Sequence, residues 1–147
     1  MNSQDPSQTI SPSWLALFVA WVVVSGATLG SLFLSEIMDI PVCVLCWYQR
    51  IALYPLVLVL GLGLFPHDPR AVRYGGALVV VGWLVAAFHV LVVYGVIPES
   101  IQPCRQGIPC SETHIDVLGF LNIPTLSLLT FSLVGALLLY AHRKIPS

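Results

Sequence analysis

The sequence predicts an all-α membrane protein in which four helices form a bundle across a lipid bilayer. Of its 147 residues, 57% are hydrophobic and only 9% are charged, and the mean hydropathy is +0.89. A soluble chain of this length needs a charged surface, so this composition is typical of an integral membrane protein. The long apolar segments lack the alternation of barrel strands, which favours helices as the spanning elements. With a net charge of only -1, the chain offers no basic surface for nucleic acid.

Four apolar segments make up a single membrane domain. Each is close to the roughly 20 helical residues that cross a hydrocarbon core. The first contains no charged residue, the second contains Arg50 and the third contains His89. The first segment lacks a preceding basic region and is too long for the apolar part of a signal peptide, so we expect it to be a span rather than a cleaved signal. The expected spans are residues 14–34, 43–65, 74–97 and 117–141.

The distribution of charge predicts how the bundle is oriented. Four of the six basic residues fall between the second and third spans or after the fourth: Arg70, Arg73, Arg143 and Lys144. An even number of spans puts both segments on the side of the N-terminus, and the positive-inside rule makes that side cytoplasmic. The other two connections then face outward, with five of the seven acidic residues and all four cysteines. We therefore expect cytoplasmic termini and two extracytoplasmic loops that carry the cysteines.

The cysteines come as two closely spaced pairs. Cys43 and Cys46 form a C-x-x-C in "PVCVLCWYQR", and Cys104 and Cys110 flank a short turn in "PCRQGIPC". Disulfides form and persist outside the cytoplasm, where this topology puts both pairs. Closing loops this short would stabilise the fold by only about 2 kcal/mol on the chain-entropy estimate. Two such bridges would be weak staples for a bundle already held by its bilayer, which favours a reactive role for the first pair.

The first pair has the surroundings of a reactive dithiol. If the second helix begins near Cys43, its free N–H groups and positive dipole end favour a thiolate there. Arg50 lies one helical turn beyond Cys46, or roughly 6 Å deeper in the membrane. A guanidinium at that depth can stabilise a thiolate or an oxygen anion on a lipid-soluble acceptor. His89 falls in a comparable layer of the third span.

Other interpretations of these residues stay open. Two cysteine pairs are also the pattern of a four-thiolate zinc site, although nothing else in the sequence calls for a metal and none is predicted. The disulfides could instead tie the loops of a non-enzymatic membrane subunit, and a proton or solute carrier would need more ionisable groups than Arg50 and His89. Arg50 could simply extend to the membrane interface, and His89 could be a buried histidine bonded to a helix carbonyl. A c-type haem is excluded because Trp47, not histidine, follows the C-x-x-C.

Four stretches of the chain resemble a known family. The stretch "CVLCWYQR" at the outer end of the second span, "CRQGIPC" in the last loop, "AFHVLVVYG" in the third span and "NIPTLSLLTF" in the fourth are similar to the DsbB disulfide-forming membrane oxidoreductases. The resemblance covers nearly the whole chain and is nearer to the BdbC branch, whose second cysteine pair is closely spaced. The vitamin K epoxide reductase-like bundles are the nearest rival. Their loop cysteines precede the C-x-x-C, whereas here the C-x-x-C comes first.

The resemblance implies a path for electrons. A protein of this kind sits in the bacterial inner membrane, reoxidises a DsbA-like or BdbD-like thioredoxin-fold thiol oxidase and reduces a membrane quinone, either ubiquinone or menaquinone. It implies that Cys104 and Cys110 exchange with the partner and that Arg50 lies beside the quinone, with His89 as a second contact. Cys46, being deeper and nearer Arg50, is expected to face the quinone. Cys43 is then expected to be the more accessible sulfur and to exchange with the loop pair.

Overall fold

The computed structural model describes residues 11–65, 68–98, 101, 116–117 and 121–144. Within these residues every helix of membrane-spanning length is apolar enough to cross a bilayer, which confirms the predicted all-α membrane bundle. The sequence did not predict a short antiparallel strand pair, in which Asp116 pairs with Asn122 and Val117 with Leu121. The elements, in chain order, are α1 (Pro12–Glu36), α2 (Val44–Leu64), α3 (Pro69–Val93), β1 (Asp116–Val117), β2 (Leu121–Asn122) and α4 (Ile123–Lys144).

Local signals fix where the first and third helices begin. The hydroxyl of Ser11 accepts a hydrogen bond from the N–H of Trp14 at 3.3 Å, and Pro12 stands in the first turn of α1. The Asp68 carboxylate accepts one from the N–H of Arg70 at 2.9 Å, and Pro69 follows it directly. A side-chain oxygen before the helix and a proline in its first turn are the usual pattern of a helix start.

Two helices differ from the apolar ranges that predicted them. Because of its capped start, α3 begins at Pro69 rather than near 74, and it ends at Val93 rather than near 97. Gly95, two residues further on, has a φ of 72°, a conformation that glycine adopts without strain. The fourth helix begins at Ile123 rather than near 117 because β1 and β2 occupy part of the residues between. Hydropathy alone places apolar residues but not these turns.

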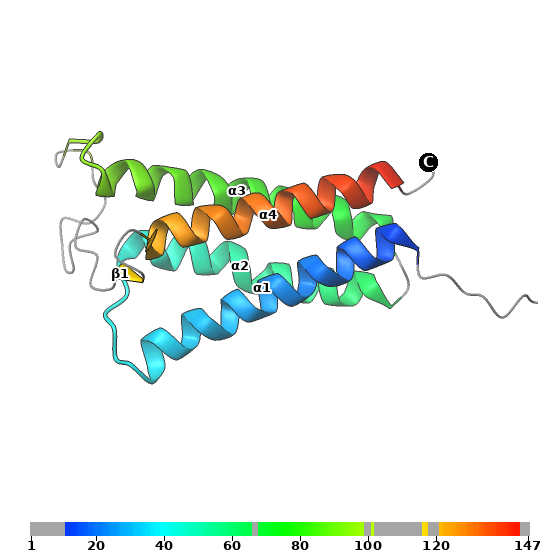
Figure 1. The fold of residues 1–147 in the computed structure, drawn as a ribbon, viewed down its shortest axis with the longest axis horizontal. Helices are drawn as coiled ribbons and strands as arrows, with labels where there is room; N and C mark the ends of the chain where they lie inside the picture. The colour runs from blue at the N-terminus through cyan, green and yellow to red at the C-terminus, as the bar shows by residue number, and fades with distance from the viewer. Residues whose placement is uncertain (1–10, 66–67, 99–100, 102–115, 118–120, 145–147) are drawn as a thin grey trace, which may run out of the picture.

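The helices are arranged in a ring in chain order. Each packs against its neighbours along the sequence, and α1 also packs against α4 (Figure 1). The Phe131 ring of α4 packs directly against Gly82 of α3, where an added methyl group would overlap it. The core is almost wholly aliphatic. Its most buried side chains include Leu17, Leu56, Leu60 and Val134.

One end of the bundle is closed and the other is open. All buried residues of α1 lie in its N-terminal half: Ser13, Ala16, Leu17, Ala20 and Val24. There the indole N–H of Trp14 donates to the carbonyl of Leu64 at 3.3 Å, which ties α1 to the end of α2. Beyond Val24 the helix diverges from the other three, as the blue to cyan ribbon in Figure 1 shows. This divergence leaves space beside the first turns of α2, where the cysteines lie.

Candidate functional site

Cys43 and Cys46 lie together at the N-terminus of α2. Cys43 is the residue that caps the helix, and its Sγ accepts a hydrogen bond from the N–H of Cys46 at 3.3 Å. The two Sγ atoms are 2.8 Å apart. A disulfide needs about 2.05 Å, so a small side-chain movement would join or separate them. The structure thus brings the pair together in the position that the sequence predicted.

The Cys43 thiol, which precedes the spanning helix, is surrounded by hydrogen-bond donors. Its pKa lies well below the ordinary value of a cysteine. The largest cause is the Cys46 thiol as a donor to the Cys43 thiolate; burial opposes it, and His89 and the backbone N–H of Cys46 lower the pKa further. Hydrogen bonds to an anion stabilise it relative to the neutral thiol. Cys43 is therefore prepared to act as a nucleophile or a leaving group.

The two cysteine residues differ in burial. Cys43 is 8% exposed and packs with Leu45 and Val92, whereas Cys46 is partly exposed. The reason for this difference is that Cys43, as the cap, turns toward the end of α3. The sequence could not supply that contact between helices. The prediction that Cys43 is the sulfur that the loop pair reaches stays a prediction, because the loop lies outside the described residues.

Arg50 lies inside the bundle, one turn below the cysteines. It is only 8% exposed, and its Nη2 donates to the carbonyl of Ser31 on α1 at 2.7 Å. The guanidinium also lies 5.6 Å from the centre of the Trp47 ring, within the range of a cation–π contact. These contacts hold the positive charge between α1 and α2.

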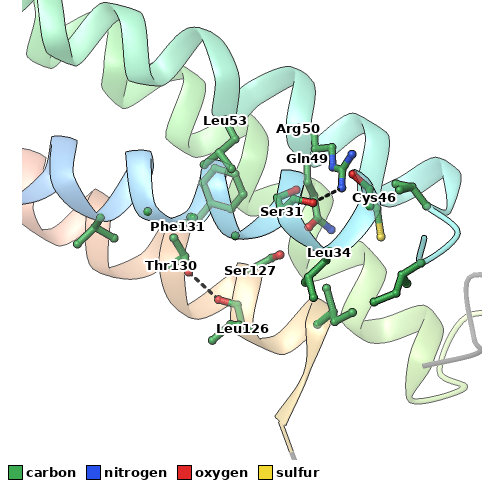
Figure 2. A pocket seen from close by; sticks show the side chains of 18 of the residues that line it. Ser31, Leu34, Cys46, Gln49, Arg50, Leu53, Leu126, Ser127, Thr130 and Phe131 are labelled. Carbon is green, nitrogen blue, oxygen red and sulfur yellow. Dashed lines mark hydrogen bonds between the residues drawn. The ribbon is translucent and has the colours of Figure 1, made fainter. Parts of the chain in front are cut away.

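The space beside Arg50 is a cavity of about 390 Å³ between α1, α2 and α4 (Figure 2). Cys46, Gln49, Arg50 and Leu53 form its α2 wall, and most of the remaining lining is aliphatic. Among the described residues that line it, Arg50 is the only charged one. An apolar cavity with a few convergent polar groups is typical of a site for a small organic molecule. Here one of the convergent groups is the thiol of Cys46, which can be oxidised and reduced.

His89 lies on the other side of the cysteine pair. It is 2% exposed, and its Nε2 is 3.8 Å from Cys43 Sγ. Its Nδ1 is 3.0 Å from the amide nitrogen of Gln49. His89 is not among the residues that line the cavity. The structure therefore brings His89 to the cysteines, and its expected contact with an acceptor in the cavity stays a prediction.

Gln49 is the residue of the site that sequence reasoning missed. It is 6% exposed, faces the cavity and bonds His89 from the neighbouring helix. A signal was present, because a polar side chain inside a membrane span is costly unless it has a partner or a function. Its position one turn beyond Cys46 could have drawn attention to it. The sequence did not reveal which helix its partner belongs to.

The remaining predicted site residues, Cys104 and Cys110, lie outside the described residues. Their exchange with Cys43 stays a prediction. The donor atoms of Cys43, Cys46 and His89 all lie within 4.8 Å of one another, which is close enough for the three to share a metal ion. Two sulfurs and one imidazole are a ligand set suited to soft metals. The expectation that the protein uses no metal is likewise not tested by this geometry.

At the N-terminus of α2, two thiols can form and break a disulfide next to an apolar cavity with one fixed positive charge. This arrangement defines a membrane-embedded thiol–disulfide oxidoreductase. Comparison with known proteins narrows this class. The family model described as "Disulfide bond formation protein DsbB" matches residues 12–141. This match covers nearly the whole chain, so the protein belongs to the DsbB family.

Curated relatives agree with the family match. The chain is 42% identical over 118 residues to "Disulfide bond formation protein C" of Bacillus subtilis, which covers 80% of this chain and 86% of the relative. It is 40% identical to "Probable disulfide formation protein C 2" of Bacillus cereus, over 83% of this chain and 86% of the relative. The "Probable disulfide formation protein" of Metapseudomonas resinovorans is 35% identical over 98% of both chains. No solved structure matches. The protein is thus a multi-pass membrane oxidoreductase of disulfide bond formation, as the resemblance implied.

Proposed function

We propose that this protein is a thiol:quinone oxidoreductase that reoxidises an extracytoplasmic thiol oxidase of the thioredoxin fold, similar to DsbA or BdbD, and transfers the electrons to ubiquinone or menaquinone. One observation carries the proposal. Cys46 and the buried cation Arg50 form the same wall of a cavity that is otherwise mainly apolar. A site of this kind suits a lipid-soluble molecule whose oxygen atoms gain negative charge as it is reduced.

The polarity of the cavity suits a quinone, and its wall on α1 leaves room for an apolar tail. The guanidinium has five N–H donors, so donors remain beyond the one that the Ser31 carbonyl accepts. On the α1 side the wall includes Gly26 and Gly30, where an added methyl group would meet no other atom within 4 Å. The glycines leave room for an apolar tail to lie along the helix. A flat ring carrying two carbonyl oxygens would thus find a cation at one place and aliphatic surface elsewhere.

Cys43 and Cys46 supply the electrons and protons in the proposed reaction. When Cys43 and Cys46 form a disulfide, the two thiols lose two protons and two electrons. A quinone bound in the cavity would accept this electron pair, and the two protons would complete its reduction to the quinol. Cys46 faces the acceptor and Arg50 stabilises the negative charge that develops on it. The aliphatic lining excludes water, which strengthens the effect of the fixed charge.

Cys43 is assigned to the exchange with the loop pair. It belongs to a small buried cluster with Val92 at the end of α3, Ile97 beyond α3 packs against this cluster, and the segment with Cys104 and Cys110 follows further along the chain. In the proposed relay the partner's thiolate attacks Cys104, Cys110 leaves, and the Cys110 thiolate then attacks Cys43. Each step forms one S–S bond and breaks another. A Cys110→Ser variant oxidised between Cys104 and Cys43 should therefore accumulate the partner joined to Cys104.

The trapped bond is identified by non-reducing electrophoresis and mass mapping of the joined peptides. A partner bonded to Cys46 instead would reverse the proposed direction of electron flow. The orientation is tested separately, with reporters fused after Phe65 or Lys144, which we expect to behave as cytoplasmic. Reporters fused within residues 98–112 should behave as exported. A cytoplasmic signal from this loop would contradict the proposal, because thiols there face a reducing pool.

The decisive experiment measures electron transfer directly. Purified protein is mixed with a reduced thioredoxin-fold partner and a soluble quinone, and the quinone absorbance is followed with time. We expect catalytic bleaching that requires both the partner and the protein. A Cys46→Ser protein serves as the matched control. A flat trace with several thioredoxin-fold partners and with both quinone types would refute the proposed function.

A further inference from the structure

We propose that Gln49 is a positioning residue that fixes the ring tautomer of His89, so that His89 donates a hydrogen bond to Cys43 while Arg50 and Cys46 serve the acceptor cavity. His89 thereby acts on the Cys43 sulfur, and Arg50 acts separately on the Cys46 sulfur. The inference deepens the proposed function, on which it rests for the assignment of Cys43 to exchange with the loop pair. The contact itself needs neither a quinone nor a partner.

Three buried polar side chains form a continuous chain between α2 and α3. Gln49, His89 and Cys43 are 6%, 2% and 8% exposed. The Gln49 amide nitrogen lies 3.0 Å from His89 Nδ1, and His89 Nε2 lies 3.8 Å from Cys43 Sγ. Buried polar groups are costly unless they are hydrogen-bonded, and in a low dielectric each such bond is stronger than in water. The arrangement is therefore expected to hold the imidazole in one orientation.

The chemistry of the amide decides which ring nitrogen carries the proton. An amide nitrogen has only donor hydrogens, so Nδ1 must be the acceptor in its contact with Gln49. The hydrogen bond made by one imidazole nitrogen sets the protonation of the other. In the neutral ring the proton then resides on Nε2, which faces Cys43. His89 is thus a donor to sulfur and stabilises Cys43 as a thiolate.

This donor acts when Cys43 leaves a mixed disulfide. An attacking thiolate forms a new S–S bond with the other sulfur, the old bond to Cys43 breaks, and the electron pair departs on Cys43 Sγ. The hydrogen of Nε2 stabilises that charge without being transferred, so no additional proton or electron is required. A better-stabilised leaving thiolate departs faster. His89 would touch the reacting sulfur, whereas Gln49 acts only through His89.

The positions of the side chains separate this contact from the cavity. Cys46 and Arg50 line the cavity, while His89 does not. Gln49 stands between the two, because it lines the cavity and also reaches across to α3. A substitution at Gln49 should therefore alter Cys43 selectively, and a substitution at Arg50 should alter Cys46 selectively. Because each substitution should affect one sulfur and not the other, the pair of variants distinguishes a positioning role from a general effect on the fold.

The tautomer is measured by nitrogen NMR of the reduced full-length protein with ¹⁵N-labelled histidine in detergent. The chain has four histidines, and the spectrum of a His89→Gln protein identifies the signals of His89. We expect a protonated Nε2 and an unprotonated Nδ1 in the natural sequence, and loss of this preference in Gln49→Leu. A protonated Nδ1 in the natural sequence would mean that the amide oxygen faces the ring. That result would overturn the proposal.

The effect on sulfur is measured by alkylation at a fixed pH in proteins that retain a single cysteine. With Cys43 as the sole thiol, Gln49→Leu and His89→Leu should each slow its modification by about tenfold, the usual effect of losing a hydrogen bond to a charged group. His89→Gln retains a donor N–H near the position of Nε2 and should restore much of the rate. With Cys46 as the sole thiol, the same Gln49→Leu change should have little effect and Arg50→Met a large one.

A cycle of variants completes the test. Once His89 is replaced by glutamine there is no ring tautomer left to fix, so adding Gln49→Leu should slow Cys43 no further. Gln49→Met repeats the experiment with a flexible side chain if Gln49→Leu disturbs packing, and the rate of Cys46 in each protein reports an intact site. Equal slowing of both sulfurs, or unchanged Cys43 reactivity in Gln49→Leu and Gln49→Met, would refute the inference. If the protein does not reduce quinone but the alkylation rates follow the expected pattern, the proposed function is refuted and this inference is not.

Discussion

The closed and open ends of the bundle use glycine for opposite purposes. In the closed half, Gly61 of α2 lets the Trp21 ring approach so closely that an added Cβ would lie 2.9 Å from the indole nitrogen. In the open half, Gly26 and Gly30 face the cavity, and an added Cβ at either would meet no atom within 4 Å. Glycine allows tight helix packing in the first case and leaves space for a ligand in the second.

The comparison teaches that stability and chemistry are divided along the length of the bundle. The closed end holds α1 against α2 with large apolar surfaces and one indole hydrogen bond. The open end has fewer buried residues and more polar groups, among them Arg50, Gln49 and His89. Substitutions at the open end should therefore affect electron transfer more than folding. Substitutions at the closed end should do the opposite.

Cys46→Ser should have the largest effect. The change removes one sulfur of the C-x-x-C, so no disulfide can form there and turnover should fall to the rate of the uncatalysed mixture. Serine is nearly the same size, so the unfolding temperature should stay close to that of the natural sequence. Quinone bleaching and thermal unfolding in detergent measure the two quantities. Appreciable turnover in this variant would remove the pair from the reaction.

Arg50→Met should reduce the rate of quinone reduction by about 100-fold, the usual cost of removing one group that stabilises a developing oxyanion. Methionine keeps much of the length of the side chain but not its charge, so the four helices should still assemble. Arg50→Lys is the matched control and should retain part of the activity, because it keeps the charge but not the planar donors. Normal turnover in Arg50→Met would show that the acceptor binds elsewhere.

Gly30→Leu should weaken saturation by the quinone by about tenfold or more, because an aliphatic side chain would occupy space that the ligand needs. The fold should survive, since an added Cβ at Gly30 meets no atom within 4 Å. Gly76→Leu on α3 is the control, because Gly76 also has nothing within 4 Å of an added Cβ but does not line the cavity. Equal effects of the two changes on the quinone KM would argue against this cavity as the acceptor site.

Leu60→Ala should leave turnover per folded molecule unchanged and lower the free energy of unfolding by about 2–5 kcal/mol. Leu60 is 0% exposed in the core, whereas Leu62, at 74% exposed, provides a control for the same change at the lipid-facing surface. The two variants are compared by unfolding in detergent and by the rate of quinone bleaching. A strong loss of activity in folded Leu60→Ala would break the division between the two ends.

The reactivity of Cys43 toward an alkylating reagent should persist to lower pH than that of a small thiol in solution. Its pKa is lowered, so the thiolate is present at neutral pH and is lost only as the pH falls through that lowered value. Reduced protein is labelled over a pH series, and the modification of Cys43 is followed by mass spectrometry. A profile that matches the small thiol would contradict the stabilisation of the thiolate by its neighbours.

The sequence by itself determined the fold class and the order of the functional groups along α2. Composition and the four apolar segments predicted the membrane bundle, because a bilayer permits few other structures for such a chain. The spacing of Cys43, Cys46 and Arg50 predicted a sulfur pair with a cation one turn deeper, because the rise of a helix is fixed. The short strands and the starts of α3 and α4 were not predicted, since hydropathy does not register caps and turns.

Only the tertiary structure decided which groups of different helices meet. The depth of His89 followed from its position in the third span, but its placement beside Cys43 depends on how α3 is rotated against α2. The partnership of Gln49 with His89 and the divergence of α1 depend on the same packing. Helical rise is a local property of the backbone, whereas the rotation and crossing of helices result from side chains distant in sequence filling a shared core. Helical rise can be deduced from the spacing of residues in a single sequence, whereas the rotation and crossing of the helices appear only in the assembled bundle.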